Sequence, residues 1–183
     1  MKIKLAHIPY ITNKISLDIL NCGFIKIVGT LDEIKKVIDI ALEDNANTEK
    51  KIEARANELL EQKEVEIDLM QIDRRNMFWL IKKNLAEQSG FDLSYDDRFN
   101  KLAHKILDSL IDDDLINFNV SENKVKNVIF NALDEYLKSY SKLEDIVYDK
   151  ISNYKREIIP GSEEYELIFE KLYQEELRKL GMF

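Results

Sequence analysis

Residues 30–42 read TLDEIKKVIDIAL, and residues 121–133 read SENKVKNVIFNAL. Apolar residues recur in both stretches at spacings of three and four, the period of a helix with one buried face. Thr30 opens the first stretch and Glu33 follows three residues later, which is the pattern of a capping box. Ser121 offers the same kind of hydroxyl cap to the second stretch. Each stretch therefore predicts the start of an amphipathic helix.

The two stretches are related by an offset of about 91 residues, and the same offset aligns positions elsewhere in the chain. Identity is low, but the matches fall on apolar, capping and glycine positions, where a common structure would keep them. We therefore predict an internal duplication, with copies at residues 1–92 and 93–183 that fold separately or exchange helices. The further matches are Lys14 with Lys105, Ile25 with Ile116, Phe78 with Phe169 and Gly90 with Gly181.

Each copy predicts three helices, one of them long, and a short extended apolar link. Because Asp, Asn and Thr are weak helix formers, the DNANT run at residues 44–48 predicts a kink or loop in the long helix of copy one. The predicted fold is all-α: an elongated helical protein from an internal duplication of a three-helix unit with one long helix per copy. The expected helices are 8–21, 30–60 with the interruption, and 71–88 in copy one, then 95–112, 122–155 and 162–180 in copy two, with links at 23–29 and 115–120.

The composition agrees with long helices and restricts the function classes. The chain has only five Gly and two Pro, and its formal net charge is −8. This charge disfavours a nucleic-acid partner, because phosphate binding needs a cationic surface. Cys22 is the single cysteine, which fits a reducing compartment. No uncharged run approaches the roughly 20 residues that span a bilayer, so we expect a cytoplasmic protein without a membrane partner.

Four segments carry a family resemblance. Residues 72–83 read IDRRNMFWLIKK, residues 102–107 read LAHKIL, residues 151–156 read ISNYKR, and residues 160–165 read PGSEEY. Together they resemble the bacterial family catalogued as domain of unknown function 507, over the whole chain. The resemblance implies an all-helical bacterial cytoplasmic protein. It brings no activity, ligand or catalytic residue.

The predicted helix 71–88 carries the most suggestive group of exposed residues. Arg75 and Trp79 are one turn apart, and an Arg–Trp–Lys surface can anchor a protein partner or stack on a nucleic-acid base. The plainer interpretation is an amphipathic helix whose cations are solvated or ion-paired. The candidate partner-binding residues are Arg74, Arg75, Trp79, Lys82 and Lys83, and the side expected to be buried is Met77, Phe78, Ile81 and Leu85.

No catalytic, metal or nucleotide motif rises above background. The run Asp112–Asp114 follows a predicted helix, and consecutive aspartates there point in different directions, so we expect a solvated turn. Cys22 lacks a local nucleophile signature. We therefore expect no enzyme activity and no cofactor, and the favoured function is a non-enzymatic helical interaction or adaptor protein. The alternative is a nucleic-acid-associated regulator that uses the basic helix 74–83.

Overall fold

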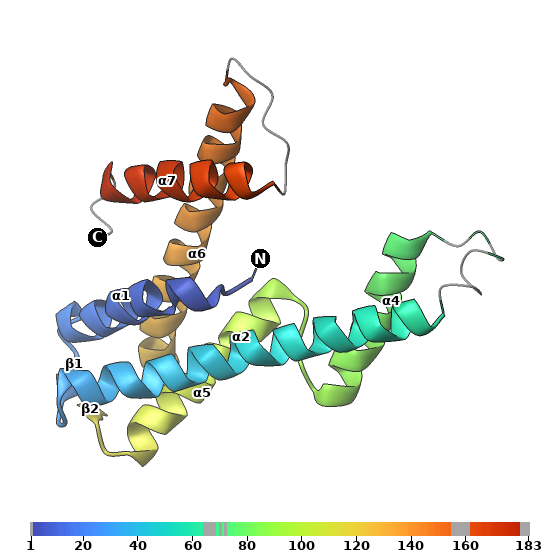
Figure 1. The fold of residues 1–183 in the computed structure, drawn as a ribbon. Helices are drawn as coiled ribbons and strands as arrows, with labels where there is room; N and C mark the ends of the chain where they lie inside the picture. The colour runs from blue at the N-terminus through green and yellow to red at the C-terminus, as the bar shows by residue number, and fades with distance from the viewer. Residues whose placement is uncertain (1, 64–68, 70, 72, 155–161, 180–183) are drawn as a thin grey trace. The chain divides into compact units, whose positions relative to one another are not determined.

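The computed structural model describes residues 2–63, 69, 71, 73–154 and 162–179, and this part of the chain is predominantly α-helical (Figure 1). The expected all-α class is confirmed. A short 3₁₀ turn, η1, precedes the first α-helix, and two three-residue strands accompany the helices. The elements are η1 (Leu5–His7), α1 (Ile8–Asn21), β1 (Ile25–Ile27), α2 (Leu31–Gln62), α4 (Arg74–Ser89), α5 (Tyr95–Asp112), β2 (Ile116–Phe118), α6 (Glu122–Ser152) and α7 (Glu163–Lys179).

The chain forms two compact units, Lys2–Leu133 and Asp134–Phe183. Helix α6 contributes its first turns to one unit and its remaining turns to the other. The predicted copies meet at residues 92 and 93 instead, which is a division by sequence repeat rather than by contacts. That domain division stays a prediction.

Helix α2 is the centre of the first unit. Figure 1 shows α1 beside its first half and α4 beside its second half, and α5 also packs against it. Its buried residues follow the helical period along its whole length, so one apolar stripe serves all three neighbours. The largest fully buried side chains of this unit include Ile11, Ile15, Ile19, Ile34, Ile38, Leu42, Phe99, Ile106, Leu107 and Leu110.

The two extended links pair with each other as an antiparallel ribbon. Ile25 lies opposite Phe118, Lys26 opposite Asn117, and Ile27 opposite Ile116. The central pair, Lys26 and Asn117, is 91 positions apart, which is the offset of the predicted duplication. Extended links were expected, but their pairing was not.

The predicted cap at Thr30 is confirmed, and the one at Ser121 stays a prediction. Thr30 caps α2 with a full capping box: the backbone N–H of Glu33 donates to Thr30 Oγ1 at 3.2 Å, and the Glu33 carboxylate accepts the Thr30 backbone N–H at 2.8 Å. The backbone N–H and the hydroxyl of Thr30 both donate to the Glu33 carboxylate and lower its pKa, the backbone hydrogen bond most. Ser94 occupies the N-cap of α5 but makes no side-chain cap hydrogen bond. Ser162 Oγ accepts the backbone N–H of Tyr165 at the start of α7.

The predicted kink in the long helix of copy one is wrong, because α2 is continuous from Leu31 to Gln62. Within the run 44–48, Ala46 is buried, and Asn45 accepts two hydrogen bonds from Arg98 on α5. These tertiary contacts outweigh the weak helix propensity of the run. In a helix, its residues are less favourable than alanine by at most about 0.7 kcal/mol each.

In the second unit, α7 packs on the later turns of α6. Tyr140 of α6 meets Tyr173 of α7 edge to face, with ring centroids 5.3 Å apart. Phe169 lies parallel to Tyr173 at 6.0 Å and contacts Tyr148 at 5.3 Å. Burial raises the pKa of the Tyr140 hydroxyl, and its hydrogen bond to Glu144 raises it further. Aromatic contacts therefore join α6 and α7, alongside buried aliphatic residues such as Leu143 and Leu177.

The element order follows the predicted offset. Helices α2 and α6 begin at Leu31 and Glu122, which are 91 positions apart, and α1 and α5 end at Asn21 and Asp112, with the same separation. This is the arrangement that a duplication predicts, although the duplication itself stays a prediction. The expected helix end at residue 155, the turn at 160–161 and the match at Gly181 lie outside the described residues.

Candidate protein-binding surface on helix α4

Local sequence signals delimit α4 at both ends. The Asp73 carboxylate accepts the backbone N–H of Arg75 at 2.9 Å, which satisfies one of the free amides of the first turn. Gly90 follows the last turn with a left-handed backbone, φ 68°, which glycine adopts without steric cost. The expected helix over 71–88 is confirmed, beginning three residues later and ending one later.

Lys82 anchors α4 on α2 through hydrogen-bonded ion pairs. Its side chain is buried, with only 2 % of the residue exposed. Its ammonium donates to the Glu49 carboxylate at 3.1 Å and to the Glu53 carboxylate at 2.6 Å. The two glutamates are four residues apart on α2 and therefore share one face. Such partners are required, because removing a charge from water without compensation costs several kcal/mol.

Arg98 extends this group of charges to α5. Its Nη1 donates to Glu49 at 2.8 Å, while Nε and Nη2 donate to the Asn45 side-chain oxygen at 3.0 and 2.6 Å. We call Glu49, Glu53, Lys82 and Arg98 the buried charge cluster. It contains two cations and two carboxylates, and it joins α2, α4 and α5.

Glu53 lies at the edge of this cluster and also forms an ion pair with Lys2 at 2.5 Å. Burial by itself raises the pKa of Glu53, but the hydrogen bonds and charges of Lys2 and Lys82 outweigh burial, and the net pKa lies below the ordinary value. The carboxylate is therefore ionised in the folded protein at neutral pH, as the pairing with Lys82 requires.

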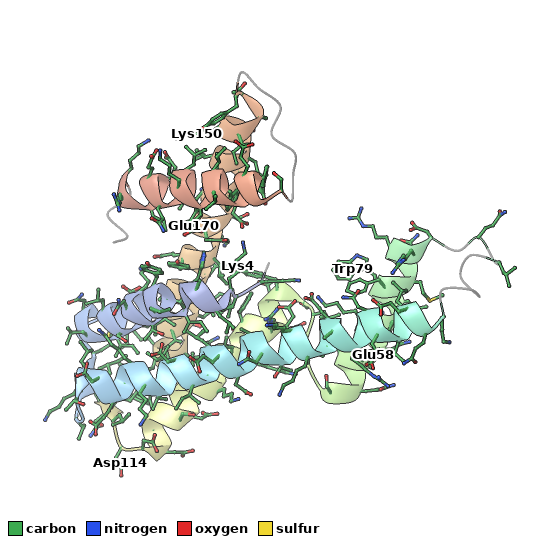
Figure 2. All side chains as sticks on the ribbon, in the orientation of Figure 1. Lys4, Glu58, Trp79, Asp114, Lys150 and Glu170 are labelled. Carbon is green, nitrogen blue, oxygen red and sulfur yellow. The ribbon has the colours of Figure 1, made fainter. Side chains whose placement is uncertain are left out.

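One flank of α4, beside the side that packs on α2, carries exposed apolar and basic residues. Trp79 and Leu80 are 51 % and 55 % exposed, although both are large apolar residues on a well-anchored helix. Arg75 precedes Trp79 by one turn and Lys83 follows it by one turn. We call Arg75, Asn76, Trp79, Leu80 and Lys83 the Trp79 face. Figure 2 labels Trp79 on α4, with Glu58 on the adjoining half of α2.

Four of the five predicted partner-binding residues lie at the surface: Arg74, Arg75, Trp79 and Lys83 are exposed. Lys82 is not, and the expectation that it continues the basic side with Lys83 is wrong. Its ammonium approaches the Trp79 ring from the interior, 5.1 Å from the ring centroid. The carboxylates of α2 hold the Lys82 ammonium inside the protein, away from the surface. Whether the remaining residues bind a partner stays a prediction.

The side of α4 expected to be buried is only partly so. The four apolar residues proposed for it are half-buried, and the fully buried positions are Lys82 and Ala86 instead. The helix therefore rests on α2 through an ion-paired lysine and a small residue, with larger apolar side chains around them. The half-buried residues are Met77, Phe78, Ile81 and Leu85.

The sequence prediction missed Glu49, Glu53, Arg98 and the exposed Leu80. The sequence contains one signal of the buried charge cluster. Glu49 falls three positions before Ile52 in the apolar stripe of α2, and a charged residue inside such a stripe indicates a buried ion pair. The identity of its partners could not be read, because Lys82 and Arg98 are distant in sequence.

The other candidates offer less chemistry. A cavity of about 310 Å³ lies between α2, α5 and the segment after α4. Its rim charges are paired, Lys105 with Asp44 and Lys101 with Asp92, so the rim lacks excess charge for a ligand. Within the described residues, no group of three His, Cys, Asp or Glu could hold a metal ion, and no helix is long and apolar enough to cross a membrane. Cys22 is a half-buried free thiol that donates to the Ile19 carbonyl.

These features define an all-α protein of paired helices in which one helix exposes an apolar centre between basic ends. The chain belongs to the family described as Protein of unknown function (DUF507), whose model matches residues 1–182. The expected family is thereby confirmed. No curated protein matches the chain.

Proposed function

We propose that this chain is a non-enzymatic interaction or adaptor protein that binds a protein partner through the Trp79 face. The observation that carries the proposal is the joint exposure of Trp79 and Leu80 on one helix. Tryptophan is among the residues that contribute most to protein interfaces.

The second half of the chain provides an internal comparison. With the offset of 91 positions, Trp79 corresponds to Glu170 and Leu80 to Lys171 on α7, and both of these are exposed charged residues. A helix at this place in the fold is therefore compatible with polar residues on its outer side. The apolar pair on α4 is not required for helix formation, and this supports a role in binding.

The anchoring of α4 also supports a binding role. The buried charge cluster holds Lys82, three residues after Trp79, to two carboxylates of α2. A binding surface on a fixed helix loses less conformational entropy on association than one on a mobile loop. The Trp79 face is thus presented in one orientation on its helix pair.

The test is site-specific photo-crosslinking in the native cell. A photoreactive residue at Asn76, in the Trp79 face, should yield one reproducible crosslinked protein. The double variant Trp79→Glu with Leu80→Lys, which carries the residues of α7, should lose the crosslink by about tenfold or more while retaining its helical circular dichroism.

Two exposed leucines on α1 supply the matched control. Leu17 and Leu20 are 48 % and 50 % exposed, so Leu17→Glu with Leu20→Lys introduces the same charges at comparable exposure on another helix. This variant should retain the crosslink. Equal loss in both double variants, or a crosslink indifferent to both, would contradict the proposal.

The nucleic-acid alternative is favoured by the exposed Arg74, Arg75 and Lys83 beside Trp79. It is weakened by the burial of Lys82, which removes one of the four cations of residues 74–83 from the surface. It requires salt-sensitive binding of single-stranded oligonucleotides that Arg75→Glu reduces. Undetectable binding at about 50 mM salt would eliminate it.

We propose the bacterial cytoplasm as the location. The free thiol of Cys22, the chain's single cysteine, supports a reducing compartment. Fractionation of native cells tests the proposal, and recovery of the protein outside the cytoplasmic fraction would contradict it.

A further inference from the structure

The Trp79 face has a regular geometry that restricts what can bind to it. Arg75, Trp79 and Lys83 follow one another at intervals of four residues, so they form one row along α4. At 1.5 Å per residue, the two cations are about 12 Å apart along the helix axis. Asn76 and Leu80 form the adjoining row. Trp79 is thus bracketed by two positive charges, and Leu80 lies in the row beside it.

Within the described chain, Arg75 and Lys83 are not neutralised by buried carboxylates as Lys82 is. Lys83 has its nearest carboxylate at Glu87, 4.0 Å away, and both side chains are two-thirds exposed. Among the described residues, the Arg75 guanidinium has no ion pair, since Asp73 receives only its backbone N–H. Two cations therefore face solvent beside apolar surface that a partner would cover.

The helix pair itself indicates the kind of partner. Helix α2 buries the side of α4 that carries Lys82 and Ala86, and the residues of the Trp79 face are exposed. Two packed helices are commonly completed by a further helix laid against them, whose apolar stripe covers the exposed side chains. Carboxylates on that helix would meet Arg75 and Lys83 if they were about 12 Å apart, or seven to eight residues along it.

We propose that the partner segment is an acidic amphipathic helix, with apolar residues between two carboxylates about two turns apart. This proposal rests on the proposed function and adds the chemistry of the partner to it. A nucleic acid fits less well, because the cations are separated by apolar residues and the whole chain carries a net charge of −8.

Trp79 provides the readout. It is the single tryptophan of the chain, so the intrinsic tryptophan emission reports directly on this face. The probes are two synthetic helical peptides of about sixteen residues with the same leucine stripe, one with two glutamates seven positions apart and one with lysines in their place. The acidic peptide should shift the emission to shorter wavelength and bind about tenfold or more tightly than the lysine peptide, with a weaker preference at high salt.

Charge reversal in the protein completes the test. Arg75→Glu with Lys83→Glu keeps the tryptophan and should invert the preference, so that the lysine peptide binds more tightly. The matched control is Lys36→Glu with Lys50→Glu on α2, two exposed lysines outside the Trp79 face, which should keep the acidic preference.

The remaining outcomes overturn the proposal in distinguishable ways. Equal binding of both peptides would exclude the charge requirement while leaving an apolar docking surface, and with it the proposed function. No emission change with either peptide would exclude an amphipathic helix, and crosslinking from Asn76 would then decide the proposed function separately. Tighter binding of a single-stranded oligonucleotide than of the acidic peptide would assign the face to nucleic acid instead.

Discussion

The two helix pairs of this protein, α2 with α4 and α6 with α7, have opposite chemistry at positions that the predicted 91-residue offset relates. In the first pair, Glu49 and Lys82 form an ion pair at 3.1 Å. The residues 91 positions later are Tyr140 and Tyr173, whose rings meet at 5.3 Å. One contact between helices is therefore ionic, and its counterpart is aromatic.

The second pair also has an ion pair, at positions where the first pair has uncharged residues. In the second pair, the Lys150 ammonium is bound to the Glu176 carboxylate, which also accepts a hydrogen bond from Lys179 at 2.6 Å. The positions that correspond to Lys150 and Glu176 in the first pair are Leu59 and Leu85, both half-buried. Each pair thus has one ionic contact, and the positions 91 residues away from it in the other pair carry no charge.

The difference teaches that two helices can be held side by side by either kind of contact, with different consequences. A buried ion pair adds little net stability but is costly to break, because the remaining charge is left without a partner. An aromatic pair adds stability through buried area and ring geometry. The ionic pair should thus respond to removal of one charge and to pH, and the aromatic pair to loss of ring volume.

The largest effect should come from Glu49→Ala, which removes the carboxylate that Arg98 binds and leaves Lys82 with Glu53 alone. We expect the free energy of unfolding to fall by about 3–5 kcal/mol, measured by urea denaturation. Glu58→Ala is the matched control on the same helix, because its ion pair with Arg55 is exposed and should cost about 0–1 kcal/mol. Similar losses in the two variants would show that the buried charge cluster is not a structural anchor.

The corresponding change in the second pair is Tyr173→Ala, which removes a ring that contacts both Tyr140 and Phe169. We expect a loss of about 3 kcal/mol, seen as faster amide hydrogen exchange along α7. Tyr173→Phe keeps the ring and should lose about 1 kcal/mol or less. If Tyr173→Phe were as damaging as Tyr173→Ala, the hydroxyl rather than the ring would hold this pair together.

The next largest effect should come from low pH, to which we expect the two helix pairs to respond differently. The lowered pKa of Glu53 and of Glu176 means that each contributes stability above the ordinary glutamate pKa of 4.5, and that this contribution is lost as the pH falls through the lower folded value. Lys150 is the main cause at Glu176, followed by Lys179. We expect α4 to loosen before α7 below about pH 4.5, because the aromatic contacts of α7 do not titrate there. An NMR pH titration of amide signals checks the order, and earlier loss of α7 would contradict it.

The smallest effect concerns helix starts rather than helix contacts. Thr30→Ala removes the side-chain half of the capping box of α2 and should cost about 1 kcal/mol in urea denaturation. Ser94→Ala, at the N-cap of α5 where the side chain makes no cap hydrogen bond, should change stability by less than about 0.5 kcal/mol. Equal costs would mean that the capping box adds nothing beyond the residue type at the N-cap.

The sequence by itself determined the helices and most of their ends. Periodic apolar residues, the Thr30 cap and the terminal Gly90 act within a few residues, so local physics decides them, and α1 and α5 begin and end as expected. The 91-residue register between the two halves stays a prediction, with which the starts of α2 and α6 agree. Of the candidate site, the exposure of Arg75, Trp79 and Lys83 agreed with the expectation.

Only the tertiary structure decided which charges are buried and where helices continue. Lys82 lies inside because two glutamates more than 25 residues away reach it, and α2 runs through Asn45 because Arg98, 53 residues later, binds that side chain. The ribbon likewise joins Lys26 to Asn117 across 91 positions. Such contacts depend on which surfaces meet after the helices form, and low local propensity or a charged side chain cannot reveal a partner that is distant in the sequence.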